Sequence, residues 1–307
     1  MRDNRLFYVH FIVALFCATV PLSAQSLLDE LNAELPAPST RVNATFKANR
    51  VLLTQSVETR KKGTLELVFN TRYWNVPGQE LRQTFGADKF SGHFGAQYAI
   101  TDRLTFGAGY TTFDGILNGF GKFRLLHQSE DDKVPFGLTL VQGASYFTKD
   151  FPVFILPEEA SDRTSFVTQA IFARKFDRNF SFQIVPTYIH MRNDVPDIEK
   201  SDLFALGFGA RYKLGNHVSL ASEYQLLFGR DKVMEGSPRE EGFNFYSLGV
   251  NWEVSKLIIQ FALTNAKSFD DIANTAITQN NFNFKAGGLH IGVGFTYVLH
   301  LKKQKVH

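Results

Sequence analysis

The feature that most constrains the fold of this chain is an alternation of apolar and polar residues with a period of two. Leu65, Leu67 and Phe69, for example, alternate with Glu66 and Asn70. That period places the two sets on opposite faces of a β-strand, each face in its own environment. The segments with this alternation predict twelve strands, at residues 63–74, 90–100, 104–112, 119–127, 135–147, 163–175, 180–191, 202–213, 217–228, 243–253, 257–265 and 288–301.

The connections between these strands alternate between short and long. The short set lies at residues 101–103, 128–134, 176–179, 214–216 and 254–256. The mostly long set lies at residues 75–89, 113–118, 149–162, 192–201, 229–242 and 266–287. Outer-membrane barrels have short periplasmic turns and longer external loops, whereas a soluble sandwich has no reason to keep such a pattern. The connections therefore favour a membrane barrel.

The apolar face is expected to point outward. Twelve strands enclose more room than the eight whose inward side chains just fill a barrel, so a polar interior is possible. Aromatic residues near strand ends suit the two lipid headgroup regions, at Tyr73, Tyr110, Tyr188, Tyr212, Trp252 and Tyr297. We predict an all-β, transmembrane, antiparallel up-and-down β-barrel of about twelve strands, closed and with a polar lumen. A soluble barrel with an apolar core is the alternative.

The first residues resemble a secretory signal. Arg2 and Arg5 precede an apolar run from Leu6 to Val20, and Leu22-Ser23-Ala24 forms a small-residue cleavage site. This pattern predicts export to the bacterial outer membrane, the alternative being an uncleaved anchor helix. The expected organisation is a signal peptide at 1–24, a periplasmic N-terminal segment and possible plug at 25–62, the barrel at 63–301 and a C-terminal tail at 302–307.

Composition excludes several kinds of chemistry. With 31 phenylalanines, 23 glycines and 21% charged residues, the chain suits aromatic strands rather than a bundle of membrane helices. Its one cysteine, Cys17, lies in the apolar run of the signal, so the mature chain is expected to lack disulfides. The net charge of +3 implies no nucleic-acid partner, and the eight histidines include no His-x-x-x-His pair. We expect no cofactor and no metal.

The inward-facing polar residues are the candidate functional surface. The inner and outer faces of the strand at 119–127 can be assigned only if Lys122 and Arg124 point inward. Rings of charge in a pore select the solutes that pass, but mixed charges in a narrow lumen can also pair and close it. The candidates are Glu66, Asn70, Arg72, Lys122, Arg124, Gln183, Arg211, Lys213, Glu223, Gln225, Glu253 and Gln260.

Two functions are therefore open. The leading hypothesis is a passive or gated pore for small polar solutes, and the alternative is a plugged barrel acting as a structural anchor or partner subunit. Gly207, Gly209, Gly292 and Gly294 would leave space on the inner face for an inserted segment. The candidate segments are Asn43–Thr59 and the loop Lys267–Gly287.

The last predicted strand carries a candidate assembly signal. His290, Gly292, Phe295 and Tyr297 follow a pattern that resembles the one read by the outer-membrane barrel-assembly machinery. An edge strand of this kind can pair with that machinery before the barrel closes. Expected partners are thus outer-membrane lipids, the assembly machinery and a small polar solute.

An enzyme of the outer-membrane phospholipase type is a less favoured alternative. Such an enzyme needs a serine beside a histidine at the outer, lipid-facing rim. His190 has the lipid-facing phase, and Ser165 lies at the outer end of the preceding strand, 163–175, whose two faces are mixed. No group for an oxyanion hole is evident in the sequence.

Several stretches carry a family resemblance. They are Ala44–Lys47, Gly119–Leu126, Ala173–Phe176, Ser181–Thr187, His190 with Asn193, and Gly207–Lys213. With these stretches, the chain resembles an uncharacterised β-barrel family common in Bacteroidota, known as a domain of unknown function. The resemblance implies an outer-membrane barrel and implies no activity.

Overall fold

The computed structural model describes residues 41–42, 44–76, 87–149, 160–191, 202–228, 243–276, 278, 281–283 and 287–301. The expected signal peptide, residues 25–40, Asn193 and the expected C-terminal tail lie outside the described residues. Within those ranges, no helix is both long enough and apolar enough to cross a membrane.

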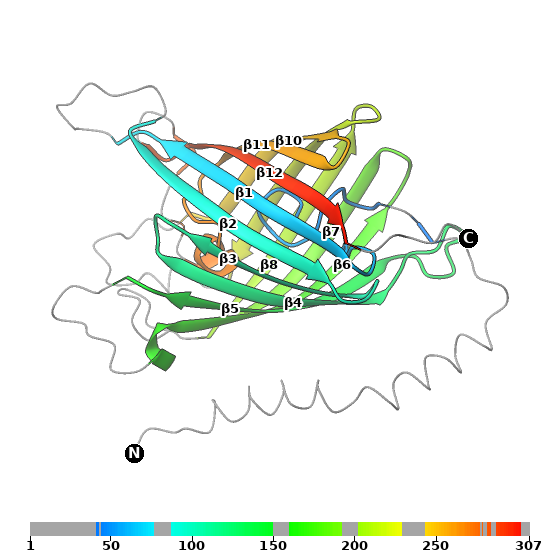
Figure 1. Ribbon diagram of the computed structural model, residues 1–307, viewed down its shortest axis with the longest axis horizontal. Coiled ribbons are helices and arrows are strands. Elements are labelled where there is room, and N and C mark those ends of the chain that lie inside the picture. The colour runs from blue at the N-terminus through cyan, green and yellow to red at the C-terminus, as the bar shows by residue number, and fades with distance from the viewer. Residues whose placement is uncertain are drawn as a thin grey trace, which may run out of the picture. The chain divides into compact units, whose positions relative to one another are not determined.

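The described residues form a closed antiparallel β-barrel (Figure 1). Each strand pairs with its sequence neighbours, and β12 pairs with β1. The strands are β1 Thr64–Trp74, β2 Lys89–Ala99, β3 Leu104–Thr111, β4 Ile116–Leu126, β5 Gly137–Phe147, β6 Thr164–Lys175, β7 Phe180–His190, β8 Asp202–Lys213, β9 Val218–Leu227, β10 Phe245–Val254, β11 Leu257–Thr264 and β12 His290–His300. A short 3-10 helix, η1 (Ala160–Arg163), precedes β6, and α4 (Asp271–Ala276) precedes β12.

The predicted fold class is confirmed. Each of the twelve predicted strands corresponds to one observed strand. The largest difference at a strand start is in β4, which begins at Ile116, three residues before the predicted start at 119. Closure runs from Thr64 opposite His300 to Tyr73 opposite Ile291. A closed ladder leaves no free strand edge, which a spanning sheet in lipid requires.

The alternation decides which side chains face outward. In β8, Phe204 is 59% exposed and Tyr212 50% exposed, while Leu203 and Arg211 on the other face are at most 4% exposed. The same separation holds around the ring, so the outer surface is a belt of aromatic and aliphatic side chains. Such a belt matches the hydrocarbon of a bilayer.

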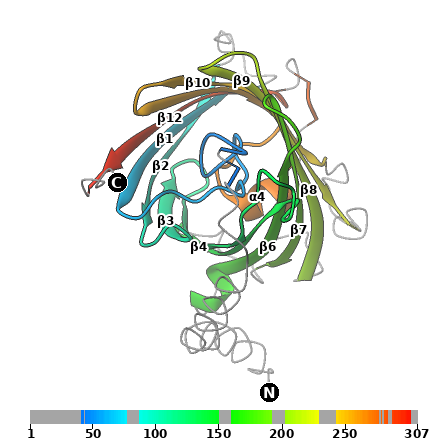
Figure 2. The same ribbon diagram turned by 90° about the vertical axis from the view of Figure 1, so that its right-hand side faces the viewer.

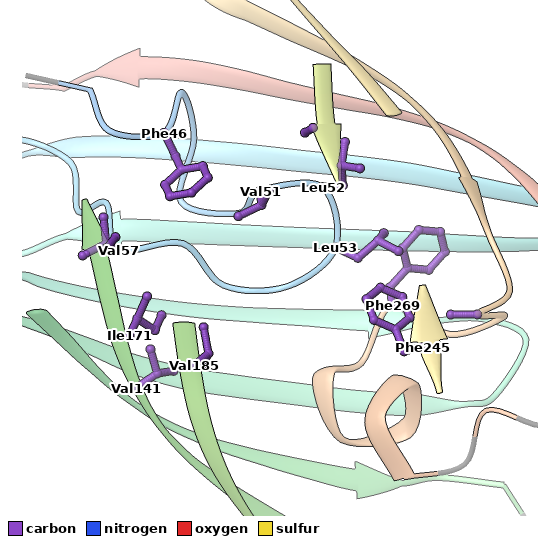
Figure 3. Packing of buried hydrophobic residues seen from close by; sticks show 13 residues of the cluster. Phe46, Val51, Leu52, Leu53, Val57, Val141, Ile171, Val185, Phe245 and Phe269 are labelled. Carbon is purple, nitrogen blue, oxygen red and sulfur yellow. The ribbon is translucent and has the colours of Figure 1, made fainter. Parts of the chain in front are cut away.

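The lumen is occupied by protein. Figure 2, a view into the ring of strands, shows the blue segment that precedes β1 and the orange α4 inside the barrel. We name residues 44–60 the lumen loop and residues 265–276 the cap segment. Both contribute to the buried apolar cluster in which Phe46, Leu53 and Phe269 pack (Figure 3).

Candidate functional site: the occupied lumen

The lumen loop enters and leaves the barrel at the same end. Before it, Arg41 pairs with Ser129 in the connection between β4 and β5. After its deepest part, the Thr59 hydroxyl donates to the Asp102 carbonyl in the connection between β2 and β3, at 2.8 Å. Both connections belong to the short set, so residues 44–60 form a re-entrant loop anchored at the short-turn rim.

The tip of the lumen loop is held by one carboxylate. The backbone N–H groups of Leu52, Leu53 and Thr54 all donate to Glu223 of β9, at 3.0, 3.0 and 2.9 Å for the nearest oxygens. The Thr54 hydroxyl adds a bond of 2.6 Å to the same side chain. Successive N–H groups that converge in this way form an anion-binding nest. Glu223 is 1% exposed, so its charge is held almost entirely by this loop.

A lysine binds backbone carbonyl oxygens of the loop, which carry a partial negative charge. The Lys122 ammonium of β4 donates to the carbonyl oxygens of Asn49, Ser56 and Glu58, at 2.7, 3.0 and 3.2 Å. An ammonium has three N–H donors, so all of them are used here. Beside it, Arg124 forms an ion pair of 2.8 Å with the Glu58 side chain.

Other wall residues complete this contact. Gln183 donates to the Gln55 carbonyl at 2.8 Å, and Gln260 donates to the Val51 carbonyl at 3.2 Å. Three further wall residues bind the loop through charged side chains. Glu66 accepts from Asn49 and Arg60, Arg211 donates to the carbonyls of Ala44 and Thr45, and Glu253 pairs with Lys47. Hydrogen bonds to ionised groups are roughly twice as strong as neutral ones.

An apolar sector of the wall receives the apolar side chains of the loop. Phe46, Val51 and Val57 are at most 2% exposed and share one cluster with wall residues (Figure 3). Those wall residues are Val141, Ile171, Ala173, Val185, Ala221 and Phe245. Burying a Val, Leu or Phe side chain contributes about 1.5–3 kcal/mol. The loop is thus held both by apolar packing and by polar bonds, in places from the same strand, as with Val185 and Gln183 of β7.

The cap segment fills the lumen next to the lumen loop. Arg72 of β1 donates to the carbonyls of Ala266 and Ser268, at 2.6 and 3.3 Å, and lies over the Phe269 ring at 4.3 Å. Ile272 of α4 packs in a second apolar cluster with wall residues of β6–β9. Gln225, another predicted lumen residue, accepts from Thr275 of this helix.

The two inserted segments touch each other. Arg50 of the lumen loop forms an ion pair with Asp271 of the cap segment, at 2.9 and 3.4 Å for its two nitrogens. Gln55 donates to the same carboxylate at 3.3 Å. The neighbouring Asp270 accepts from the Ala273 N–H at 2.9 Å and from the Ser145 hydroxyl, and burial raises the pKa of Asp270.

Ten of the twelve predicted lumen residues thus contact one of the inserted segments. The other two, Asn70 and Lys213, lie on the inner phase of β1 and β8, Asn70 being buried and Lys213 half-buried. Two cavities within the described lumen measure about 10 and 20 Å³, which is room for about one water molecule each. In the part of the chain that the structure describes, these side chains hold protein rather than line an open passage.

The serine and histidine of the enzyme alternative are not brought together. Ser165 is fully buried on the inner face of β6, whereas His190 has the outward phase of β7. His190 pairs with Asp202 of β8 at 2.8 Å, and Tyr188 donates to the same carboxylate at 2.6 Å. The pairing of Ser165 with His190 expected for a phospholipase is therefore wrong, because the two side chains point to opposite sides of the wall.

The candidate assembly signal lies in β12, the strand that closes the ring on β1. Phe295 and Tyr297 face outward, with exposures of 36% and 43%, while His290 is buried inside against Trp74, their ring centroids 5.2 Å apart. Gly292 lies opposite Arg72, so its missing side chain leaves space beside that guanidinium. Recognition by the assembly machinery stays a prediction. Among the described residues, no cluster of three or more His, Cys, Asp or Glu side chains could hold a metal ion.

Sequence reasoning did not identify the residues of the inserted segments that make these contacts. Asn49, Arg50, Glu58 and Asp271 lie outside the alternating strands, and no motif marks them. The glycine pattern of the inner face was the available signal, since it indicated room for an insertion. It gave no information on which polar groups would meet.

Comparison with curated proteins gives no match. Among solved structures, the KdgM porin is 5% identical with a TM-score of 0.48, covering 76% of this chain and 99% of that one. The NanC porin is 5% identical with a TM-score of 0.49, covering 76% and 98%. An outer membrane channel from Pseudomonas putida F1 is 13% identical with a TM-score of 0.42, covering 79% and 98%. At TM-scores below 0.5, these likenesses carry no functional assignment.

A family match spans the lumen loop and the barrel together. The family described as "Membrane bound beta barrel domain (DUF5777)" matches residues 46–299, from Phe46 in the loop to Leu299 near the end of β12. The match agrees with the resemblance seen in the sequence, while an origin in Bacteroidota stays a prediction. The chain belongs to this family of membrane-bound β-barrels.

Proposed function

We propose that this chain is a plugged outer-membrane barrel, closed to solutes at rest, that acts as a structural anchor or partner subunit. The observation that carries the proposal is the capture of the loop tip by Glu223, whose carboxylate accepts three successive backbone N–H groups and the Thr54 hydroxyl. A carboxylate that selected passing solutes would be hydrated in an open lumen. Here it is enclosed by the plug, the lumen loop at residues 44–60.

The chemical complementarity between the wall and the plug supports this proposal. Charged and amide side chains of the wall meet backbone groups of the plug, and the apolar sector of the wall meets its apolar side chains. A lumen built only for small polar solutes would not need Ile171 or Val185 on its inner face. Their presence is explained by a permanent or long-lived protein occupant.

A gated pore is the second candidate function. It is favoured by one observation, which is that the plug enters and leaves at the same rim. A loop attached in this way can withdraw without separating any pair of strands. The polar groups of the wall, Lys122 and Glu223 among them, would then be hydrated and would face the solute.

Single-channel conductance of the folded full-length protein in planar bilayers tests whether the lumen is closed at rest. For a plugged barrel we expect no steady conductance from the wild type. The Arg72→Glu variant should open intermittently, because its carboxylate faces the carbonyls of Ala266 and Ser268 that Arg72 now binds. Steady wild-type conductance whose ion selectivity shifts in Arg72→Glu would overturn the proposal in favour of an open, charge-lined pore.

A further inference from the structure

The outer face of the described strands carries a side-chain amide at an unusual depth. Gln142 lies in the middle of β5 with the outward phase, between Val141 and Gly143, both buried on the inner side. In the middle of the described strands, it is the one side-chain amide on the outer face, and no charged side chain accompanies it there. The surrounding belt is apolar, so Gln142 faces the hydrocarbon of the bilayer.

The hydrogen bonds of this amide are incomplete. Its oxygen accepts from the Thr168 hydroxyl of β6 at 2.7 Å. Among the described residues, its nitrogen, which has two N–H donors, reaches only the Gly143 carbonyl, at 3.4 Å. An amide donor left without a partner in an apolar medium is unfavourable, because nothing there replaces its hydrogen bond to water. A further acceptor at this position would relieve that cost.

The surface next to Gln142 is built from small residues. Ala96, Ala108, Gly119 and Ala144 are neighbours across β2, β3, β4 and β5, and all have the outward phase. Large side chains such as Phe94 and Phe106 stand out around this row, with exposures of 57% and 49%. A low, flat area of this kind lets another backbone approach closely, which is the usual basis of packing between proteins in a membrane.

We propose that this face, centred on Gln142 and Thr168, is the contact between two copies of this chain in the membrane. A side-chain amide is both donor and acceptor, so two Gln142 amides related by a two-fold axis can donate to each other's oxygens. The small-residue row is likewise matched by its own copy. The inference is independent of whether the plug moves, because the side-chain hydrogen bonds of Gln142 run to Gly143 and Thr168 of the wall itself.

Site-directed crosslinking tests the position of the contact. In a Cys17→Ser background, Gln142→Cys should form a disulfide-linked dimer on mild oxidation in proteoliposomes. The matched control is Phe261→Cys, on the outer face of β11 and 48% exposed, which should stay monomeric. Equal crosslinking at both positions, or crosslinking of Gln142→Cys to a different protein in cells, would overturn a two-fold contact between copies.

Dimer affinity tests the role of the amide. Energy transfer between labelled copies should show that Gln142→Leu, a change that suits a lipid-facing site, raises the dimer Kd about tenfold or more, since it removes both amide–amide hydrogen bonds of the two-fold contact. Gly119→Leu should also block association, and its added Cβ meets only the Gly107 carbonyl at 3.7 Å, so the barrel accommodates it. A folded wild type that is monomeric, or unchanged affinity in both variants, would refute the proposal.

Discussion

Replacing Glu223 by glutamine should loosen the plug while leaving the barrel intact. The carboxylate now accepts the N–H groups of Leu52, Leu53 and Thr54 and the Thr54 hydroxyl. Glutamine keeps one oxygen but turns an N–H₂ group toward the Leu53 N–H, which loses its bond of 3.0 Å and keeps only the longer bond of 3.2 Å to the remaining oxygen. Bonds to charged groups contribute about 1.5–3 kcal/mol each, and burying glutamine costs less than burying a carboxylate. We therefore expect the free energy that holds the plug in the lumen to fall by about 3 kcal/mol.

That loss corresponds to about a hundredfold rise in the fraction of molecules with the plug released. The assay is the rate at which a water-soluble maleimide labels Leu53→Cys in a Cys17→Ser background, because Leu53 is only 6% exposed. When opening and closing are fast, the labelling rate follows the open population. Glu223→Gln should therefore accelerate labelling about a hundredfold.

The matched control is Ser222→Ala, the neighbouring residue of β9 on the outer face. It should leave the labelling rate unchanged. A rate for Glu223→Gln within threefold of its parent, in a barrel shown to be folded, would mean that the carboxylate does not hold the loop tip.

Three further predictions concern other contacts of the inserted segments and the short-turn rim. Lys122→Met removes the donor from three plug carbonyls, so the hydrogen-exchange rate of residues 44–60 should rise at least about tenfold while that of β8 is unchanged. Equal exchange of residues 44–60 in the wild type and in Lys122→Met would contradict this prediction. Arg50→Gln and Asp271→Asn, made singly and together, should show a coupling of about 1 kcal/mol in the Leu53→Cys labelling assay, and additive effects would exclude a functional ion pair. His127, beyond the end of β4, has a pKa lowered by burial to about 3, so it is neutral in the folded state and its contribution to stability is lost as pH falls from about 6.5 toward 3; urea unfolding at pH 7 and pH 4 should show a smaller acid loss in His127→Gln.

The strands could be predicted from the sequence because the two faces of most of them meet different environments. Leu65 and Phe69 face lipid while Glu66 and Arg72 face the lumen. This difference in environment produces an alternation of apolar and polar residues with a period of two in the sequence. The alternation of loop lengths then identified a membrane barrel. Local pattern was sufficient because each strand is amphipathic by itself.

The exception was β6, and its cause is the plug. On the inner face, Val167, Ile171 and Ala173 are apolar because they pack against inserted protein rather than water. On the outer face, Thr168 is polar. Both faces are therefore mixed, and the phase of Ser165 could not be assigned from the pattern.

The contacts of the lumen could not be predicted for a different reason. The sequence identified Glu223 and Lys122 as inward residues and residues 43–59 as a candidate insertion. Which backbone group meets which side chain depends on contacts such as Leu52 with Glu223, separated by 171 positions in the chain. No local periodicity encodes a pairing at that separation.

This separation has a consequence for the order of assembly. The plug precedes β1, yet its tip is bound by β9 and its carbonyls by β4. Contacts between such distant parts of a chain form late, because a long stretch must first be arranged. We therefore expect the inward charges to stay hydrated while the strands insert, and the lumen loop to order last. Its ordering would mark the moment at which the ring is complete.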